Sequence, residues 1–263
     1  MKARAVVRRA STNDMSTETR GWRDFGSFRA LPRASVTKMS DMPSRFRRVF
    51  SSSVGTKLLM GLTGILLFLY MVLHLAGNAL IFAGADVFNE YSHMLISNPL
   101  IIPIEIGLAL VFLVHIYKAV TMWTANRAAR PVGYGKKEWA GHTSRKSVAS
   151  STMILSGILI AIFVIIHVKQ FKFGSWYLVG DSDVRDLFAT EVEVFQNPLW
   201  VAVYVIVVLL VGLHIRHGFA SGFQSLGIDH PVYTRKLTAI GIFFAILIGL
   251  GLAVIPVWVY LTY

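Results

Sequence analysis

The chain has 263 residues, of which 54% are hydrophobic and 15% are charged, and its formal net charge is +12. Soluble domains have about 25% charged residues, so this composition excludes an ordinary soluble domain. The sequence contains no cysteine, which excludes disulfides, Cys-ligated iron–sulfur clusters and covalent c-type haem attachment within this chain.

The first part of the chain differs in composition from the rest. Residues 1–56 are rich in Arg and Ser, mostly polar and without helical periodicity. We expect residues 1–45 to be a disordered basic tail or an incorrectly assigned start, with Met42 as a sensible alternative start. Residues 46–263 are expected to form one transmembrane domain.

Five apolar stretches follow, at roughly 57–83, 100–125, 149–171, 198–222 and 237–261. About 20 apolar residues suffice for one membrane helix, and the period-two pattern of barrel strands is missing. The sequence therefore predicts an all-α integral membrane protein with five transmembrane helices.

The charges between these stretches predict their orientation. The first 57 residues hold 13 Lys and Arg and residues 118–146 hold seven, whereas residues 76–99 hold none and residues 172–197 are acidic. The positive-inside rule therefore places the N-terminus in the cytoplasm and the C-terminus outside. We interpret the basic excess as a topology signal, with a further contribution to attraction for anionic lipid, and not as nucleic-acid binding.

A helical hairpin is duplicated within this domain, and each copy contains two histidines. Thr63-Gly64-Ile65-Leu66, seven residues and His74 recur as Ser156-Gly157-Ile158-Leu159, seven residues and His167. Asn98-Pro99-Leu100, fourteen residues and His115 recur as Asn197-Pro198-Leu199, fourteen residues and His214. Asn98 and Asn197 are expected as N-caps, with Pro99 and Pro198 at the first helical position.

The rise of about 1.5 Å per helical residue pairs these histidines by depth. His74 and His167 are expected near the outer face, and His115 and His214 near the inner face. Facing helices that supply one imidazole each can bind a metal or haem in a bundle core. The alternative for a single membrane histidine is a hydrogen bond between helices. Four at matched depths predict two b-type haems, separated by very roughly 10–15 Å in depth.

Other polar residues are weaker candidates. His217 follows His214 by three residues and could replace it as a ligand or contact a haem propionate, and Arg216, Lys118 and Arg127 lie near the same end. Their alternative role is snorkelling to lipid headgroups.

Glu105 is the one acidic residue within a predicted span, which suggests a role in proton or quinone handling; the alternative is a carboxyl satisfied by its neighbours. His93 is expected in the outer loop, and His142 and His230 in inner-side loops with surface or structural roles.

These features together resemble the cytochrome b membrane anchor of succinate dehydrogenase, in its single-chain, five-helix, two-haem form, which some quinol:fumarate reductases share. The resemblance covers about residues 45–261. It rests on the order of the four histidines, on Asn89 to His93, on Asn98-Pro99-Leu100, on Glu105-Ile106, on His214 to Gly218 and on Phe223-Gln224-Ser225-Leu226-Gly227.

The resemblance implies a subunit of respiratory complex II in the inner (cytoplasmic) membrane of a bacterium. His74 and His167 would ligate the outer haem, and His115 and His214 the inner haem. A flavoprotein and an iron–sulfur subunit on the cytoplasmic face would deliver electrons from succinate, and quinone, menaquinone rather than ubiquinone, would accept them. Glu105 and His93 are the candidates for quinone and proton handling. Membrane lipid and further copies of the complex are additional candidate partners.

Two other functions remain open. A cytochrome b subunit of a hydrogenase or formate dehydrogenase also uses bis-histidine haems in a helical bundle. A small transporter or a passive membrane anchor would use no haem, although the repeat here is parallel and transporters often have inverted repeats with broken helices.

Overall fold

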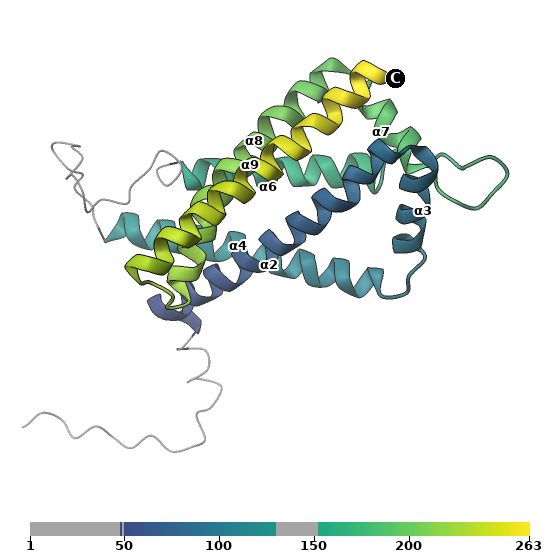
Figure 1. Ribbon diagram of the computed structural model, residues 1–263. Coiled ribbons are helices and arrows are strands. Elements are labelled where there is room, and N and C mark those ends of the chain that lie inside the picture. The colour runs from purple at the N-terminus through teal and green to yellow at the C-terminus, as the bar shows by residue number, and fades with distance from the viewer. Residues whose placement is uncertain (1–47, 49, 130–151) are drawn as a thin grey trace, which may run out of the picture. The chain divides into compact units, whose positions relative to one another are not determined.

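The computed structural model describes residues 48, 50–129 and 152–263, so the predictions for residues 1–45 and for His142 lie outside the described residues. Within the described ranges every regular element is a helix, and extended pairing is limited to one bridge between Leu178 and Arg185. The elements are α2 (Ser53–Asn78), η2 (Ala79–Ala83), α3 (Ala85–Ile96), α4 (Ile101–Ala128), α6 (Met153–Phe171), α7 (Leu187–Phe195), α8 (Pro198–Ser225) and α9 (Pro231–Thr262) (Figure 1).

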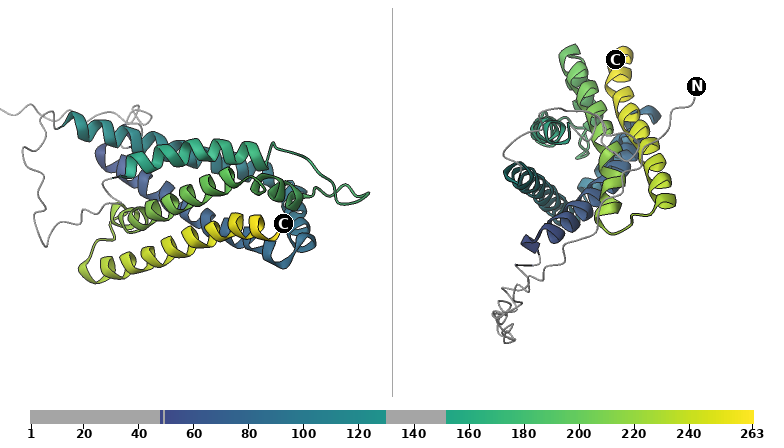
Figure 2. Two further views of the ribbon diagram at one scale, coloured as in Figure 1. Left: turned by 90° about the horizontal axis from the view of Figure 1, so that it is seen from above. Right: turned by 90° about the vertical axis from the view of Figure 1, so that its left-hand side faces the viewer.

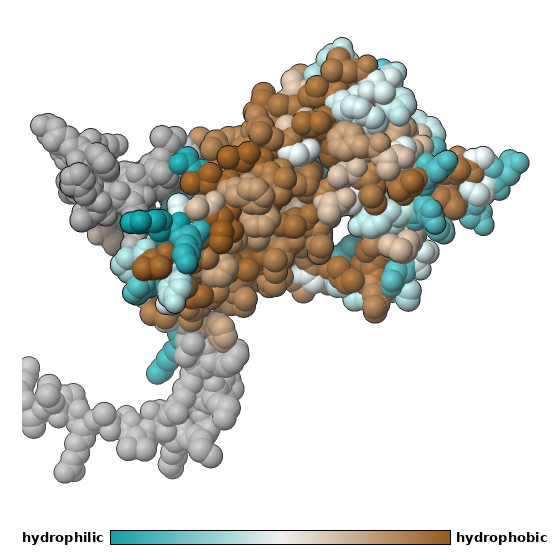
Figure 3. Space-filling view, viewed as in Figure 1, coloured by the Kyte–Doolittle hydropathy of each residue, from teal (hydrophilic) through white to brown (hydrophobic). Residues whose placement is uncertain are grey.

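Five of the described helical segments are long and apolar enough to cross a membrane: Ser53–Ala83, Ile101–Ala128, Met153–Phe171, Pro198–Ser225 and Pro231–Thr262. The all-α prediction with five spans is thus confirmed. Hydrophobic residues cover the middle of the face shown in Figure 3, and hydrophilic residues gather at its two ends. A continuous apolar surface of this kind suits contact with lipid.

The two repeated Asn-Pro-Leu motifs begin their helices differently. Asn197 is the N-cap of α8, its side chain accepts from the amide of Leu199, and Pro198 occupies the first turn, as predicted. The prediction for Asn98 is wrong by two residues, because α4 has Leu100 as its N-cap. The Asn98 side chain still accepts from the amide of Leu100 at 2.9 Å, the bond that Asn197 makes to Leu199, and its backbone oxygen accepts from the amide of Ile101 at 3.0 Å in a turn that precedes the helix.

The two predicted outer loops contain helices of their own. η2 and α3 lie between α2 and α4, and α7 lies between α6 and α8. His93, expected in a loop, is therefore in the last turn of α3. α9 begins at Pro231, six residues before the predicted start, because His230 acts as its N-cap and accepts from the amide of Val232.

The four histidine-bearing helices form a ring. Neighbours pack in the order α2, α4, α6, α8 and back to α2, whereas the diagonal pairs α2/α6 and α4/α8 are not among the closely packed pairs. The fifth span, α9, packs mainly against α8, and Figure 2 shows it on the opposite side of α8 from α6. Each diagonal therefore crosses the interior of the ring.

Small residues let the helix backbones approach closely where α8 crosses its neighbours. A Cβ added to Gly61 of α2 would lie 2.8 Å from the backbone oxygen of Gly222, and one added to Gly212 would lie 2.8 Å from the backbone oxygen of Ala245 in α9. Glycine at such crossings is typical of membrane helix packing. These contacts fix α8, and with it His214, against α2 and α9.

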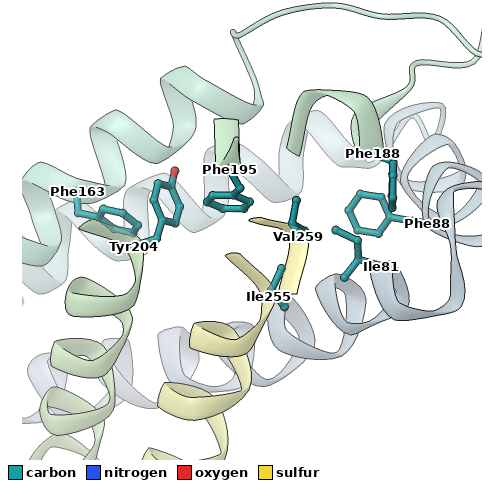
Figure 4. Close-up of a cluster of buried hydrophobic side chains, with 8 residues drawn as sticks. All are labelled: Ile81, Phe88, Phe163, Phe188, Phe195, Tyr204, Ile255 and Val259. Carbon is teal, nitrogen blue, oxygen red and sulfur yellow. The ribbon is translucent and has the colours of Figure 1, made fainter. Parts of the chain in front are cut away.

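A buried cluster joins the helix ends at the side where α3 and α7 lie, here called the α3/α7 end. It contains Ile81, Phe88, Phe163, Phe188, Phe195, Tyr204, Ile255 and Val259 (Figure 4). The side chain of Asn89 links the two short helices. Its Nδ2 atom donates to the Asp186 carboxylate at 2.8 Å, and its Oδ1 atom accepts from the backbone amide of Phe188 at 3.0 Å. Asp186 in turn caps α7.

Candidate functional site

The structure brings the four repeated histidines together as two pairs. The ring centres of His74 and His167 lie 5.7 Å apart, with an angle of 83° between the rings. Those of His115 and His214 lie 6.4 Å apart, with an angle of 61°. All four residues are half-buried. The first pair joins α2 to α6 and the second joins α4 to α8, so each pair lies across a diagonal of the ring.

The spacing within each pair suits a shared metal ion. Two imidazoles that bind one ion through bonds of about 2 Å have ring centres about 6 Å apart. The described residues contain no group of three or more His, Cys, Asp or Glu side chains that could hold a metal ion. An ion at either pair would therefore need further ligands from elsewhere, such as the four nitrogens of a porphyrin. The residues present thus fit the two-haem prediction.

Hydroxyl groups of α2 and α6, the first helices of the two repeats, contact the second pair, His115 and His214. The Nδ1 atom of His115 lies 3.1 Å from the Thr63 hydroxyl, and that of His214 lies 3.1 Å from the Ser156 hydroxyl. The glycine after each hydroxyl lies beside the ring: a Cβ at Gly64 would lie 3.4 Å from Cε1 of His115, which is an ordinary van der Waals distance. A Cβ at the equivalent Gly157 would lie 3.7 Å from Cε1 of His214.

The first pair has different partners. The Nδ1 atom of His167 lies 3.3 Å from the phenol oxygen of Tyr204, which itself donates to Gln170 at 2.7 Å. The Nδ1 atom of His74 has two longer contacts of 3.4 Å, to the hydroxyl of Tyr70 and to the amide nitrogen of Asn78. The Tyr204 hydroxyl gives its proton to Gln170, so its oxygen can accept from Nδ1 of His167, as is usual for imidazoles that bind metals through Nε2. At His74 the Tyr70 hydroxyl can accept in the same way, whereas the Asn78 amide nitrogen can only donate.

The spacing within the repeat explains this geometry. Thr63 precedes His74 by eleven residues, and Ser156 precedes His167 by eleven. Eleven residues make about three helical turns, so both side chains share one face. They lie about 16 Å apart along the helix axis. One helix therefore supplies a histidine to the first pair and a hydroxyl to the second.

The other candidates near the second pair lie on the same helices. His217 is half-buried, one turn after His214, and Arg216 is exposed. Lys118, one turn after His115, donates to the backbone oxygen of Phe50 at 2.9 Å. Arg127, further along α4, is exposed and packs its guanidinium over the ring of Trp123. Lys118 and His217 each follow a histidine of the second pair by one turn and so share its side of the helix, whereas Arg216 follows His214 by two residues and lies on another face of α8.

Glu105 and His93 lie towards the α3/α7 end without joining either pair. Glu105, in the second turn of α4, forms an ion pair with Lys172 at the end of α6. Both side chains are more than one-third exposed, so the carboxylate is not a buried charge. His93 is exposed on α3.

Glu191, which was not among the residues predicted from the sequence, is only 5% exposed in α7. Its Oε2 atom has no hydrogen-bond partner within the described part of the chain, and burial raises the pKa of its carboxyl to about 8. It lies one turn before Phe195, whose ring packs 5.0 Å from that of Tyr204. No sequence pattern distinguishes it from the other acidic residues of the segment 172–197.

Comparison with family models, curated proteins and solved structures finds no match to this chain.

Proposed function

We propose that this protein is the di-haem cytochrome b membrane anchor of a succinate:quinone oxidoreductase, respiratory complex II. The strongest support is that four histidines meet as two pairs, and that each pair joins helices on opposite sides of the ring. Membrane histidines that serve only as hydrogen-bond partners have no reason to meet one another twice at a spacing suited to a shared metal ion.

In this proposal His74 and His167 hold one b haem, and His115 and His214 hold the other. When bound, two bis-imidazole haems supply one-electron carriers with no open coordination position, which suits transfer from an iron–sulfur subunit to membrane quinone. The chain itself fixes the four imidazoles and surrounds the sites with apolar side chains that exclude water. Lys118 and His217 would contact propionates at the second pair.

The charge distribution orients the anchor. By the positive-inside rule, the basic N-terminal segment and residues 118–146 favour an orientation with the second pair towards the cytoplasm and the α3/α7 end outside. The flavoprotein and iron–sulfur subunits would then dock at the cytoplasmic face of a bacterial inner membrane. Glu105 and His93 would lie on the outer side, where we place proton and quinone handling, with menaquinone as the favoured quinone.

The test is reduction of the cytochrome in native membranes by alternative donors. Succinate should produce b-type absorbance from this chain, and added fumarate should reoxidise it. Reduction by hydrogen or formate but not by succinate would assign the chain to a hydrogenase or formate dehydrogenase. Quinol-driven reduction with fumarate as the favoured acceptor would indicate a quinol:fumarate reductase. A colourless, folded chain would indicate a transporter or passive anchor.

A further inference from the structure

Thr63 and Ser156 are unusual among the membrane-spanning residues. Both are buried, with exposed fractions of 5% and 6%, and within the described spans they are the polar residues classed as buried. A buried hydroxyl is costly unless it is hydrogen-bonded. Each one lies against a histidine of the second pair, and the two occupy equivalent positions of the duplicated hairpin.

The hydrogen bonds of these hydroxyls determine the direction of the contact with each imidazole. Thr63 donates its hydroxyl proton to the backbone oxygen of Leu59 at 2.7 Å. Ser156 donates its proton to the backbone oxygen of Met153 at 3.1 Å. A hydroxyl has one proton and two lone pairs. At Thr63 the 2.7 Å bond to the backbone is shorter than the 3.1 Å contact with His115, so the proton is used there and the oxygen is left to accept from the imidazole. The Ser156 oxygen lies 3.1 Å from both Met153 and His214, and we infer the same direction from its equivalent position in the repeat.

The imidazoles must then donate from Nδ1, which makes Nε2 the unprotonated nitrogen. A neutral imidazole binds a metal through its unprotonated nitrogen. The hydroxyls therefore hold His115 and His214 in the tautomer that a metal requires, with the ligating nitrogen turned away from the hydroxyl.

We propose that Thr63 and Ser156 are positioning residues that fix the ligand tautomer of His115 and His214 and set the potential of the group these two histidines hold. The inference rests on the proposed function. An Nδ1–H that donates to an acceptor makes its imidazole a stronger electron donor to the metal. Such donation favours the oxidised metal, so loss of the acceptor raises the midpoint potential.

The first pair supplies an internal control. Its imidazoles contact Tyr204, Tyr70 and Asn78 and neither of the two hydroxyls. A change at Thr63 should therefore move one of the two midpoint potentials and leave the other unchanged. The T63S variant separates the hydrogen bond from packing, because it keeps the hydroxyl and loses the methyl group.

The experiment is a redox titration of the purified wild-type complex and of T63V, T63S and S156A, with haem quantified per chain. We expect T63V and S156A each to shift the same one of two potentials to a more positive value, and T63S to keep the wild-type value. T238V is the matched control, because Thr238 makes the same bond to its own helix, to the backbone oxygen of Thr234 at 2.8 Å, but is exposed and apart from the histidines.

The outcomes separate this inference from the proposed function. No haem in the folded wild type overturns the proposed function. Two haems in the wild type with unchanged potentials in T63V and S156A overturn the positioning role alone. If T63V fails to retain haem, recovery of the haem and of its potential in T63S supports the positioning role, because T63S keeps the hydroxyl. Loss of the haem in T63S contradicts this role, whether T238V keeps its haem or loses it.

Discussion

Replacement of Glu191 by Gln should remove the loss of stability that the wild-type protein shows between pH 6 and pH 9. The Glu191 carboxyl is buried, and its pKa is raised by burial from the ordinary 4.5 to about 8. In the folded protein it is therefore protonated at neutral pH, whereas the unfolded chain has it ionised. Its contribution to stability is fully present below pH 4.5 and is lost as the pH rises through 8. Gln has the same shape and does not titrate.

The size of the effect follows from the pKa difference. Between pH 6 and the folded pKa of about 8 there are about two pH units, and each costs about 1.36 kcal/mol. Wild-type protein should thus lose roughly 3 kcal/mol of stability between pH 6 and pH 9, and the E191Q variant should lose none of this amount.

The difference in stability is measured by unfolding the protein in detergent at pH 6 and pH 9, with proteolysis of the segment 172–186 as the readout. Glu193 on the same helix is exposed, so E193Q is the matched control and should keep the wild-type pH dependence. Two results would contradict titration of a buried Glu191 carboxyl: an E191Q variant whose stability depends on pH as in the wild type, or a wild type with equal stability at both pH values.

Three further predictions concern packing and proton handling. G61A places a methyl group 2.8 Å from a backbone oxygen of α8 and should destabilise the protein by about 1–3 kcal/mol in thermal unfolding. G107A, which meets no atom within 4 Å, is its control. N89A leaves the buried amide of Phe188 without its partner and removes one of the bonds to Asp186, and should cost about 1–3 kcal/mol, seen as faster proteolysis of the segment before α7. E105Q should slow quinone reduction and leave haem content unchanged, with K172Q testing whether the ion pair matters.

Each of these has a clear contrary result. Equal melting temperatures for G61A and G107A would contradict the close crossing of α2 and α8. Unchanged proteolysis in N89A would show that the link between α3 and α7 does not hold that end together. Normal quinone reduction in E105Q would remove Glu105 from the proton-handling role, and loss of haem in this variant would assign it to packing.

The five spans could be predicted because their signal is long and redundant. The pairing of the histidines could also be anticipated, since depth in a helical bundle follows from the count of residues between cap and side chain. Asn197 caps its helix as expected, whereas Asn98 makes the same side-chain bond in a turn that precedes α4, so the local motif predicts the bond and not the first helical residue.

The contacts that surround the histidines could not be predicted in the same way. The duplicated Thr/Ser-Gly pair was visible as a repeat, but its contact with a histidine on a different helix depends on the helix rotation. Tyr204 and Glu191 have no repeat or motif that marks them. Burial of Glu191 arises from the packing of α7 on four other helices, which a local pattern does not encode.

Haem quantified per chain from a reduced-minus-oxidised spectrum tests whether each histidine pair holds one haem. We predict two b-type haems per wild-type chain, with H74A and H115A each losing a different one and H230A, which alters a helix cap outside the pairs, losing neither. A well-folded wild-type protein without haem, or loss of the same haem in H74A and H115A, would contradict the account.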